Sequence, residues 1–173
     1  MSRRKPSLRG FPPIAAPGAT RLILGSMPGR ASLAANRYYA HPRNAFWLIM
    51  GELFGAGPDL PYARRVRALQ RAGIAVWDVL AGCAREGSLD ADIDERSIVA
   101  NDFDSFFRSH RRIERVFFNG GAAEALFRRH VLRTLQLNSV RLERLPSTSP
   151  ANASWSIERK LRAWRVVREG AGE

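Results

Sequence analysis

The chain first becomes strongly apolar at residues 21–29, RLILGSMPG, where a run of aliphatic residues ends in a loop of glycine, serine and proline. A short apolar run that glycine and proline bound is typical of a buried β-strand. Further short runs rich in apolar residues occupy positions 73–77, 115–118 and 140–145. We therefore predict four short strands, the first of them at 21–24.

Amphipathic stretches lie between and after these strands. Apolar residues recur at helical spacing over residues 44–55, 61–72, 101–109, 121–136 and 154–168. Ser154 is the expected N-cap of the last helix. Because strands alternate with helices, we expect a parallel sheet with helices on both faces. The sequence thus predicts the α/β fold class, as a three-layer α/β/α sandwich around a four-stranded parallel sheet.

Length and composition indicate one domain of ordinary size in 173 residues. Residues 1–19 hold four cations, four prolines and two glycines, so we expect a flexible basic arm there and a single domain at 20–173. One cysteine, Cys83, excludes an internal disulfide, and the three histidines are too widely spaced for a metal site. No run approaches the ~20 apolar residues of a membrane helix, and none forms a signal peptide. We expect a cytoplasmic protein that works without a metal or other cofactor.

Positive charge is the strongest compositional signal. The chain has 28 Lys and Arg residues against 16 Asp and Glu residues, a formal net charge of +12, and all but Lys5 and Lys160 of these cations are arginines. The planar guanidinium group suits phosphate recognition, so this excess favours nucleic acid as the partner. The alternative is that the arginines only solvate the surface.

Polar residues follow each predicted strand. Ligands of parallel sheets bind outside the carboxyl ends of the strands, so these segments are expected to line one crevice. They are residues 25–29 with the loop that leads on to Asn44, then Asp78, then 119–121, and finally 146–152. Aromatic faces stack on bases and small polar groups hold phosphates. The signatures of a P-loop, a nucleophile elbow and a dinucleotide site are absent from the sequence.

Three stretches resemble a known family. They are GSMPG at 25–29, YYAHPRNAFW at 38–47 and LPSTSPAN at 145–152, and they look like the uracil-DNA glycosylase superfamily. The best match is its hypoxanthine-DNA glycosylase branch, which is similar to the mismatch-specific uracil/thymine glycosylases. The resemblance implies a DNA repair enzyme. Such an enzyme flips a deaminated base, hypoxanthine or uracil, out of double-stranded DNA and hydrolyses its N-glycosidic bond to leave an abasic site.

The resemblance also implies catalytic roles. Gly25, Ser26, Met27, Pro28 and Gly29 form the motif that approaches the flipped nucleotide and the catalytic water. Met27 stands where uracil-excising relatives carry the Asp or Asn that positions this water. In the hypoxanthine branch the catalytic polar residue is an asparagine, which matches Asn44 here. Asn44 is alternatively the N-cap of the next helix, and the two roles are compatible.

Base recognition is implied for three residues. Tyr39 matches the aromatic residue that stacks on the extruded base, and Asp78 lies where the uracil enzymes have a base-reading asparagine. His41 either donates to the leaving base or a phosphate, or holds the turn before Pro42.

A second motif is expected to press on the minor groove and the phosphates. It comprises Ser147, Thr148, Ser149, Pro150, Ala151 and Asn152. Ser147 replaces the His or Asn of relatives and Ala151 replaces their wedge leucine, so with Met27 these departures argue against efficient uracil excision.

Three further expectations follow. Lys5 and Lys160 lie outside the crevice loops, so no amine is available for a strand-nicking Schiff base and the enzyme should be monofunctional. We expect a monomer whose partner is duplex DNA with a damaged or mismatched base, and which associates with the nucleoid when bound. The alternatives are a non-catalytic DNA-binding module of the same fold and an α/β phosphohydrolase, the latter disfavoured because no acidic pair follows the strands.

Overall fold

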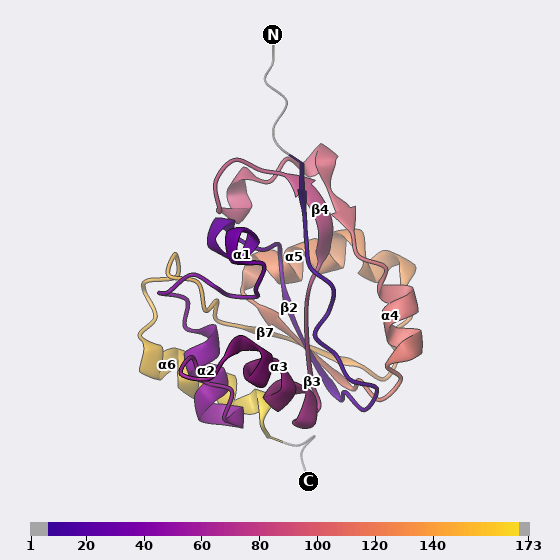
Figure 1. Cartoon of the computed structure of the whole chain (residues 1–173). Helices are drawn as coiled ribbons and strands as arrows, with labels where there is room; N and C mark the ends of the chain where they lie inside the picture. The colour runs from indigo at the N-terminus through magenta and orange to yellow at the C-terminus, as the bar shows by residue number, and fades with distance from the viewer. Residues whose placement is uncertain (1–6, 170–173) are drawn as a thin grey trace.

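A parallel four-stranded sheet forms the centre of the computed structural model, which describes residues 7–169. The strands lie in the order β3-β2-β6-β7 (Figure 1). They are β2 (Arg21–Gly25), β3 (Ile74–Asp78), β6 (Arg115–Asn119) and β7 (Arg141–Leu145), and every neighbouring pair is parallel. The four predicted strands are confirmed.

Helices cover both faces of this sheet. They are α1 (Arg30–Ala35), α2 (Phe46–Phe54), α3 (Tyr62–Arg71), α4 (Phe103–Ser109), α5 (Gly121–His130) and α6 (Ile157–Trp164). Figure 1 shows α2, α3 and α6 on one side and α4 and α5 on the other. The predicted three-layer α/β/α sandwich is confirmed. Within residues 7–169, no helix has the length and apolar character needed to cross a membrane.

Alternating residues of the strands belong to two separate hydrophobic clusters, because successive side chains of a strand point to opposite faces. In β2, Leu22 and Leu24 pack in the cluster that contains Phe103 and Phe127, while Ile23 packs in the cluster that contains Trp164. Strands β2, β3 and β6 are thus largely buried on both faces, as expected for a covered parallel sheet, whereas the edge strand β7 carries charged residues and is only partly buried.

The predicted flexible arm is wrong for residues 7–19. Strand β1 (Ser7–Arg9) pairs with β4 (Leu80–Ala84) in an antiparallel arrangement, and Ile14 forms a bridge with Val76. Prolines and glycines prevent a helix in this segment but permit extended pairing, and its apolar side chains supply the anchors. The boundary at residue 20 is therefore wrong as well. Residues 1–6 of the predicted arm and 170–173 of the predicted domain lie outside the described residues.

Side-chain hydrogen bonds fix the same segment. The Tyr38 hydroxyl donates to the carbonyl of Pro12 at 2.9 Å, and the Trp77 indole N–H donates to the carbonyl of Phe11 at 3.1 Å. Strand β5 (Val99–Ala100) completes a second sheet of order β1-β4-β5. The sequence analysis missed this sheet, because LAGCA in β4 carries no apolar alternation and Val79 alone separates it from β3.

Several helices are shorter than their predicted ranges, and two of the differences have a physical reason. The N-cap of α6 is Ser156, whose hydroxyl accepts from the N–H of Arg159, whereas Ser154 lies in the preceding turn. Both serines can cap a helix, and composition does not distinguish them. Helix α5 ends at His130, and the 3-10 turn η3 (Leu132–Thr134) replaces the rest of the predicted helix at 121–136.

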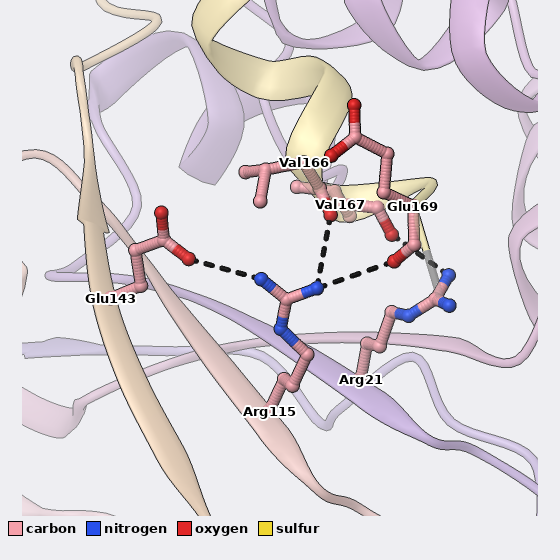
Figure 2. Close-up of polar contacts among 6 residues, drawn as sticks. All are labelled: Arg21, Arg115, Glu143, Val166, Val167 and Glu169. Carbon is pink, nitrogen blue, oxygen red and sulfur yellow. Dashed lines mark hydrogen bonds and ion pairs between the residues drawn. The ribbon is translucent and has the colours of Figure 1, made fainter. Parts of the chain in front are cut away.

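Two arginines at the amino ends of the central strands hold the end of the last helix (Figure 2). Arg21 donates to the carbonyl of Val167 at 2.8 Å, and Arg115 donates to the carbonyls of Val166 and Glu169, each at 3.2 Å. These carbonyls follow α6, those of Val166 and Val167 in the 3-10 turn η4 (Arg165–Val167) and that of Glu169 just beyond it, where the helix itself supplies no donors. Arg115 also pairs with Glu143 of β7. The guanidinium groups thus satisfy the negative end of the helix dipole.

We expect Ile14→Ala to lower the free energy of unfolding by about 2–5 kcal/mol, because truncation of a buried aliphatic side chain leaves a cavity. The Ile14 side chain is 7% exposed and packs beside Val76. Gly18→Ala is the matched control in the same segment, since a Cβ there meets no atom within 4 Å. Urea unfolding of both variants measures the difference. Equal stabilities would show that residues 7–19 do not pack on the sheet.

Candidate functional site

The carboxyl ends of all four parallel strands open into one pocket of about 320 Å³. The loop after β2, Asp78 at the end of β3, Asn119 at the end of β6 and the loop after β7 all contribute to its wall. The volume lies at the lower end of the range for small-molecule sites. The crevice that the sequence analysis placed at this edge is therefore present.

All of the predicted site residues but one line this pocket. They are Gly25, Ser26, Met27, Pro28, Gly29, Tyr39, His41, Asn44, Asp78, Ser147, Thr148, Ser149, Pro150 and Ala151. The exception is Asn152, whose side-chain amide donates to the carbonyl of Ser147 at 3.1 Å and so shapes the loop from behind. Their functional roles stay predictions.

Eight further residues line the wall. They are Arg30, Ala31, Ser32, Tyr38, Ser88, Leu89, Asp90 and Asn119. All but Ser88, Leu89 and Asp90 lie in segments that the sequence analysis expected at the crevice, although it gave them no individual role. Residues 88–90 carry no signal in the sequence, because they reach the pocket through the segment between β4 and β5.

A glycine makes room for two polar groups at the floor of the pocket. Gly25 and Asp78 are paired across β2 and β3. A Cβ on Gly25 would lie 2.5 Å from a carboxylate oxygen of Asp78 and 2.9 Å from the Tyr39 hydroxyl. Every other residue type would displace one of these groups, so this position requires glycine.

Tyr39 adopts an unusual backbone conformation. Its φ angle of 53° lies in the left-handed region, which bulky residues rarely enter. Its ring stacks on Phe46 with centroids 3.9 Å apart, and burial raises the pKa of its hydroxyl. Backbone strain of this kind concentrates at functional sites. One ring face is covered by Phe46, and the hydroxyl stays neutral at physiological pH.

Asp78 is a buried acid in an environment that disfavours its charge. It is 4% exposed, and its Oδ2 has no hydrogen-bond partner within residues 7–169. Burial raises the pKa of Asp78 to about 7, the charge of Asp90 adds to the rise, and Arg85 opposes it. Near neutral pH a large fraction of this carboxyl is therefore protonated. In that form it both donates and accepts hydrogen bonds.

Asn44 and His41 are held by the turn that precedes α2. The Asn44 side-chain oxygen accepts from the N–H of Phe46 at 3.0 Å, which leaves its NH₂ group for the pocket. The His41 Nδ1 accepts from the N–H of Arg43 at 3.1 Å. In the neutral ring the proton then resides on Nε2, so His41 offers a donor. The N-cap position of α2 is Ala45, so Asn44 lies one residue before it, accepts from the first N–H of the helix and lines the pocket at once.

The loop after β7 is tied to its neighbours from three directions. Asn119 donates to the Thr148 hydroxyl at 3.0 Å and accepts from the N–H of Thr148 at 2.9 Å. The carbonyl of Thr148 accepts from the N–H of Ala45 at 3.0 Å. Lys160, buried in α6, donates to the carbonyl of Ser149 at 3.3 Å, and burial lowers its pKa. Lys160 does not line the pocket.

Residues 85–90 clamp the loop after β2. Arg85 is 1% exposed and donates to the carbonyl of Pro28 at 2.7 Å. The Ser88 hydroxyl accepts from the N–H of Arg30 at 2.9 Å. The Asp90 carboxylate, in the 3-10 turn η1 (Asp90–Asp92), accepts from the Ser26 hydroxyl at 2.6 Å. Among the described residues, no group of three His, Cys, Asp or Glu side chains could hold a metal ion.

Comparison with known proteins identifies relatives over nearly the whole chain. The family model described as "Uracil DNA glycosylase superfamily" matches residues 12–168. A protein of Methanosarcina acetivorans named hypoxanthine DNA glycosylase is 33% identical over 163 residues, covering 92% of this chain and 96% of that protein. One of Methanosarcina barkeri with the same name is 37% identical over 113 residues, covering 65% and 70%. A solution NMR structure from M. acetivorans, assigned as a uracil DNA glycosylase, matches with a TM-score of 0.74 at 32% identity over 94% of this chain and 97% of that chain.

We expect Asp78→Asn to stabilise the protein more at pH 8 than at pH 4. The folded-state pKa of about 7 lies above the ordinary value of 3.8, so between these values the folded protein binds the proton more tightly than the unfolded chain. Wild-type stability contributed by this group therefore falls as the pH rises through this window. The asparagine has no such dependence, and the difference should reach a few kcal/mol, at about 1.4 kcal/mol per unit.

Urea unfolding of the wild type and Asp78→Asn at the two pH values measures this effect. Any packing difference between the two proteins that does not depend on pH cancels in the comparison. Asp92→Asn, at an exposed carboxylate, is the control. A stabilisation by Asp78→Asn that is equal at both pH values would contradict the prediction.

Proposed function

Because the chain belongs to the uracil DNA glycosylase superfamily and is a DNA glycosylase, we propose that its substrate is double-stranded DNA containing hypoxanthine. It flips this deaminated base into the pocket and hydrolyses the N-glycosidic bond, leaving an abasic site. The observation that carries the proposal is the pocket itself. Asn44 and the Asp78 carboxyl share it, while a buried methionine, Met27, stands where uracil-excising relatives carry a polar group.

Base recognition is proposed for Asp78 and Tyr39. Hypoxanthine presents an N–H donor beside a carbonyl acceptor, and a neutral carboxyl group matches this edge with one acceptor and one donor. The unpartnered Oδ2 of Asp78 is available for one of these bonds. Tyr39 stacks on the base with the ring face that Phe46 does not cover. Uracil has the same donor–acceptor edge, so pocket size and Met27 must provide the preference.

The proposed chemistry follows from the charges that develop. As the glycosidic bond breaks, the sugar becomes cationic and the base leaves with the electron pair, so donors near the base lower the barrier. The NH₂ group of Asn44 and the Nε2–H of His41 face the pocket as such donors. Asn44 also orients the attacking water. It cannot accept the proton of this water, because an amide is not a base at neutral pH.

DNA contacts are proposed for both rims of the pocket. The loop of Ser147, Thr148, Ser149, Pro150, Ala151 and Asn152 presses on the minor groove, and residues 25–29 approach the flipped nucleotide. The net charge of +12 attracts the duplex. We further propose a monofunctional monomer in the cytoplasm, associated with the nucleoid when bound. The burial of Lys160 behind the loop supports the absence of Schiff-base chemistry.

The proposal is tested by single-turnover excision in the presence of a chelator. Duplexes carry deoxyinosine, deoxyuridine, deoxyxanthosine or an etheno adduct at one position, and alkaline cleavage reveals abasic sites. We expect hypoxanthine to be released fastest. Release of uracil far ahead of hypoxanthine would overturn the substrate assignment, and tight binding without any abasic product would favour the non-catalytic module.

Asn44→Ala should separate catalysis from capping. If Asn44 acts on the substrate, the single-turnover rate falls by about 10²–10³, comparable with the loss of one preorganised contact. The lost cap costs about 1 kcal/mol of stability in addition. Asn44→Ser restores the cap, so it should recover the melting temperature and leave the rate low. Recovery of both in the serine variant would reduce Asn44 to a structural residue.

A further inference from the structure

The proposed hydrolysis leaves one proton without an acceptor. Water that attacks the anomeric carbon must lose a proton, and neither Asn44 nor His41, the residues that carry the proposed chemistry, takes it. Asn44 is an amide, and Met27 is apolar. The Nδ1 of His41 is occupied by the N–H of Arg43, and its Nε2 carries the proton of the neutral ring. A proton acceptor is needed for any base that this site excises. The inference below therefore rests on the proposed function only in that the reaction is hydrolysis of an N-glycosidic bond, and not on the identity of the base.

Two carboxyl groups line the pocket within the described part of the chain, Asp78 and Asp90. Asp78 is buried at the floor, where protonation suits it to the edge of the base. Asp90 lies on the wall, where the residue as a whole is exposed to solvent although its carboxyl group is partly desolvated. The two acids therefore have different environments, the arrangement by which one site holds a neutral carboxyl and a charged one.

Asp90 is held in a defined orientation. Its Oδ1 accepts from the Ser26 hydroxyl at 2.6 Å, a short bond of the kind that charge on the acceptor favours. The contacts of Ser88 and Arg85 with the loop after β2 fix the segment on the near side of Asp90. Its Oδ2 has no hydrogen-bond partner within residues 7–169, so it is free to meet a water molecule.

A carboxylate at this place weakens attraction for a polyanion. The whole chain, Asp90 included, carries a formal net charge of +12, which suits binding to phosphates. An acid that lines the DNA-facing pocket therefore needs a role other than affinity.

We propose that Asp90 is the general base of the reaction and accepts the proton of the attacking water at Oδ2. The water oxygen bonds to the anomeric carbon while the bond from this carbon to the base nitrogen breaks. The electron pair of the broken bond leaves on the base, and the water proton moves to Asp90. The base then takes up a proton from solvent, and Asp90 releases its own. Ser26 is a positioning residue, since its hydroxyl orients the carboxylate.

The surroundings of Asp90 set the pH at which this works. Desolvation raises the pKa of Asp90, while the Ser26 hydroxyl and the Arg85 guanidinium lower it. Asp78, Tyr39 and Cys83 are coupled to it by charge, and Arg30 and His41 line the same pocket. The excision rate should therefore fall at low pH as Asp90 becomes protonated. This fall should begin at a higher pH than an ordinary aspartate would give.

The test is Asp90→Asn, which keeps an oxygen for the Ser26 hydroxyl and removes the base. Asp92→Asn is the control, because Asp92 is an exposed acid of the same turn. We expect Asp90→Asn to lower the single-turnover rate about 10²-fold or more and to abolish the acid limb of the pH profile. Its melting temperature and DNA affinity should match those of Asp92→Asn, which should excise at the wild-type rate. Added azide, a nucleophile with no proton to lose, should restore bond cleavage by Asp90→Asn.

Two results would overturn the proposal. One is an Asp90→Asn enzyme with the wild-type rate and pH profile, or with no greater loss than Asp92→Asn. The other is a slow enzyme that azide does not rescue, which would place the carboxylate elsewhere in the reaction. Both variants are assayed on deoxyinosine and deoxyuridine duplexes. A wild type inactive on inosine but active on uracil contradicts the proposed substrate and leaves the test of Asp90 intact.

Discussion

Two hydrogen bonds between Asn119 and Thr148 hold the pocket in shape. Asn119 ends β6, the strand next to β7, and its amide binds both the backbone N–H and the hydroxyl of Thr148. The carbonyl of Thr148 in turn accepts from Ala45, the residue after Asn44. The position of Asn44 therefore depends on a strand end about seventy residues away in the sequence. Because Thr148 is 1% exposed, water does not compete for these bonds, and they retain their full strength.

The opposite edge of the sheet supports the same loop through α6. Arg21 and Arg115 bind the carbonyls at the end of this helix (Figure 2). From the helix, Lys160 donates to the carbonyl of Ser149 and the Trp164 indole donates to the carbonyl of Pro146 at 2.9 Å. The guanidinium groups at the amino ends of the strands thus fix the element on which the loop at the carboxyl ends rests. The support of the loop after β7 therefore depends on both arginines through α6.

Local sequence determined what could be predicted. Strands β2, β3 and β6 are short runs of mostly apolar residues, so the sheet and its polar strand ends were recognisable from the sequence, and Asp78 with them. The segment at 7–19 was not, because its prolines are compatible with a free arm and with an extended strand. Contacts distant in the sequence decide between these, since Phe11 packs on Tyr38 and accepts from Trp77, and Ile14 pairs with Val76. Asp90 was missed for the same reason. Its approach to Ser26 depends on the path of the chain after β4.

The pocket differs in charge from the chain as a whole. The net charge of +12 suits binding to a phosphate backbone without regard to sequence. The pocket instead is lined by two carboxyl groups, Asp78 and Asp90, together with Arg30, so under the proposed function it would favour an uncharged base over a phosphate. Asp78 remains buried with an unpartnered oxygen, which costs stability. Under the proposed function, a base that supplies the missing partner would recover this cost on binding, so the destabilised carboxyl would itself favour a base with a donor–acceptor edge.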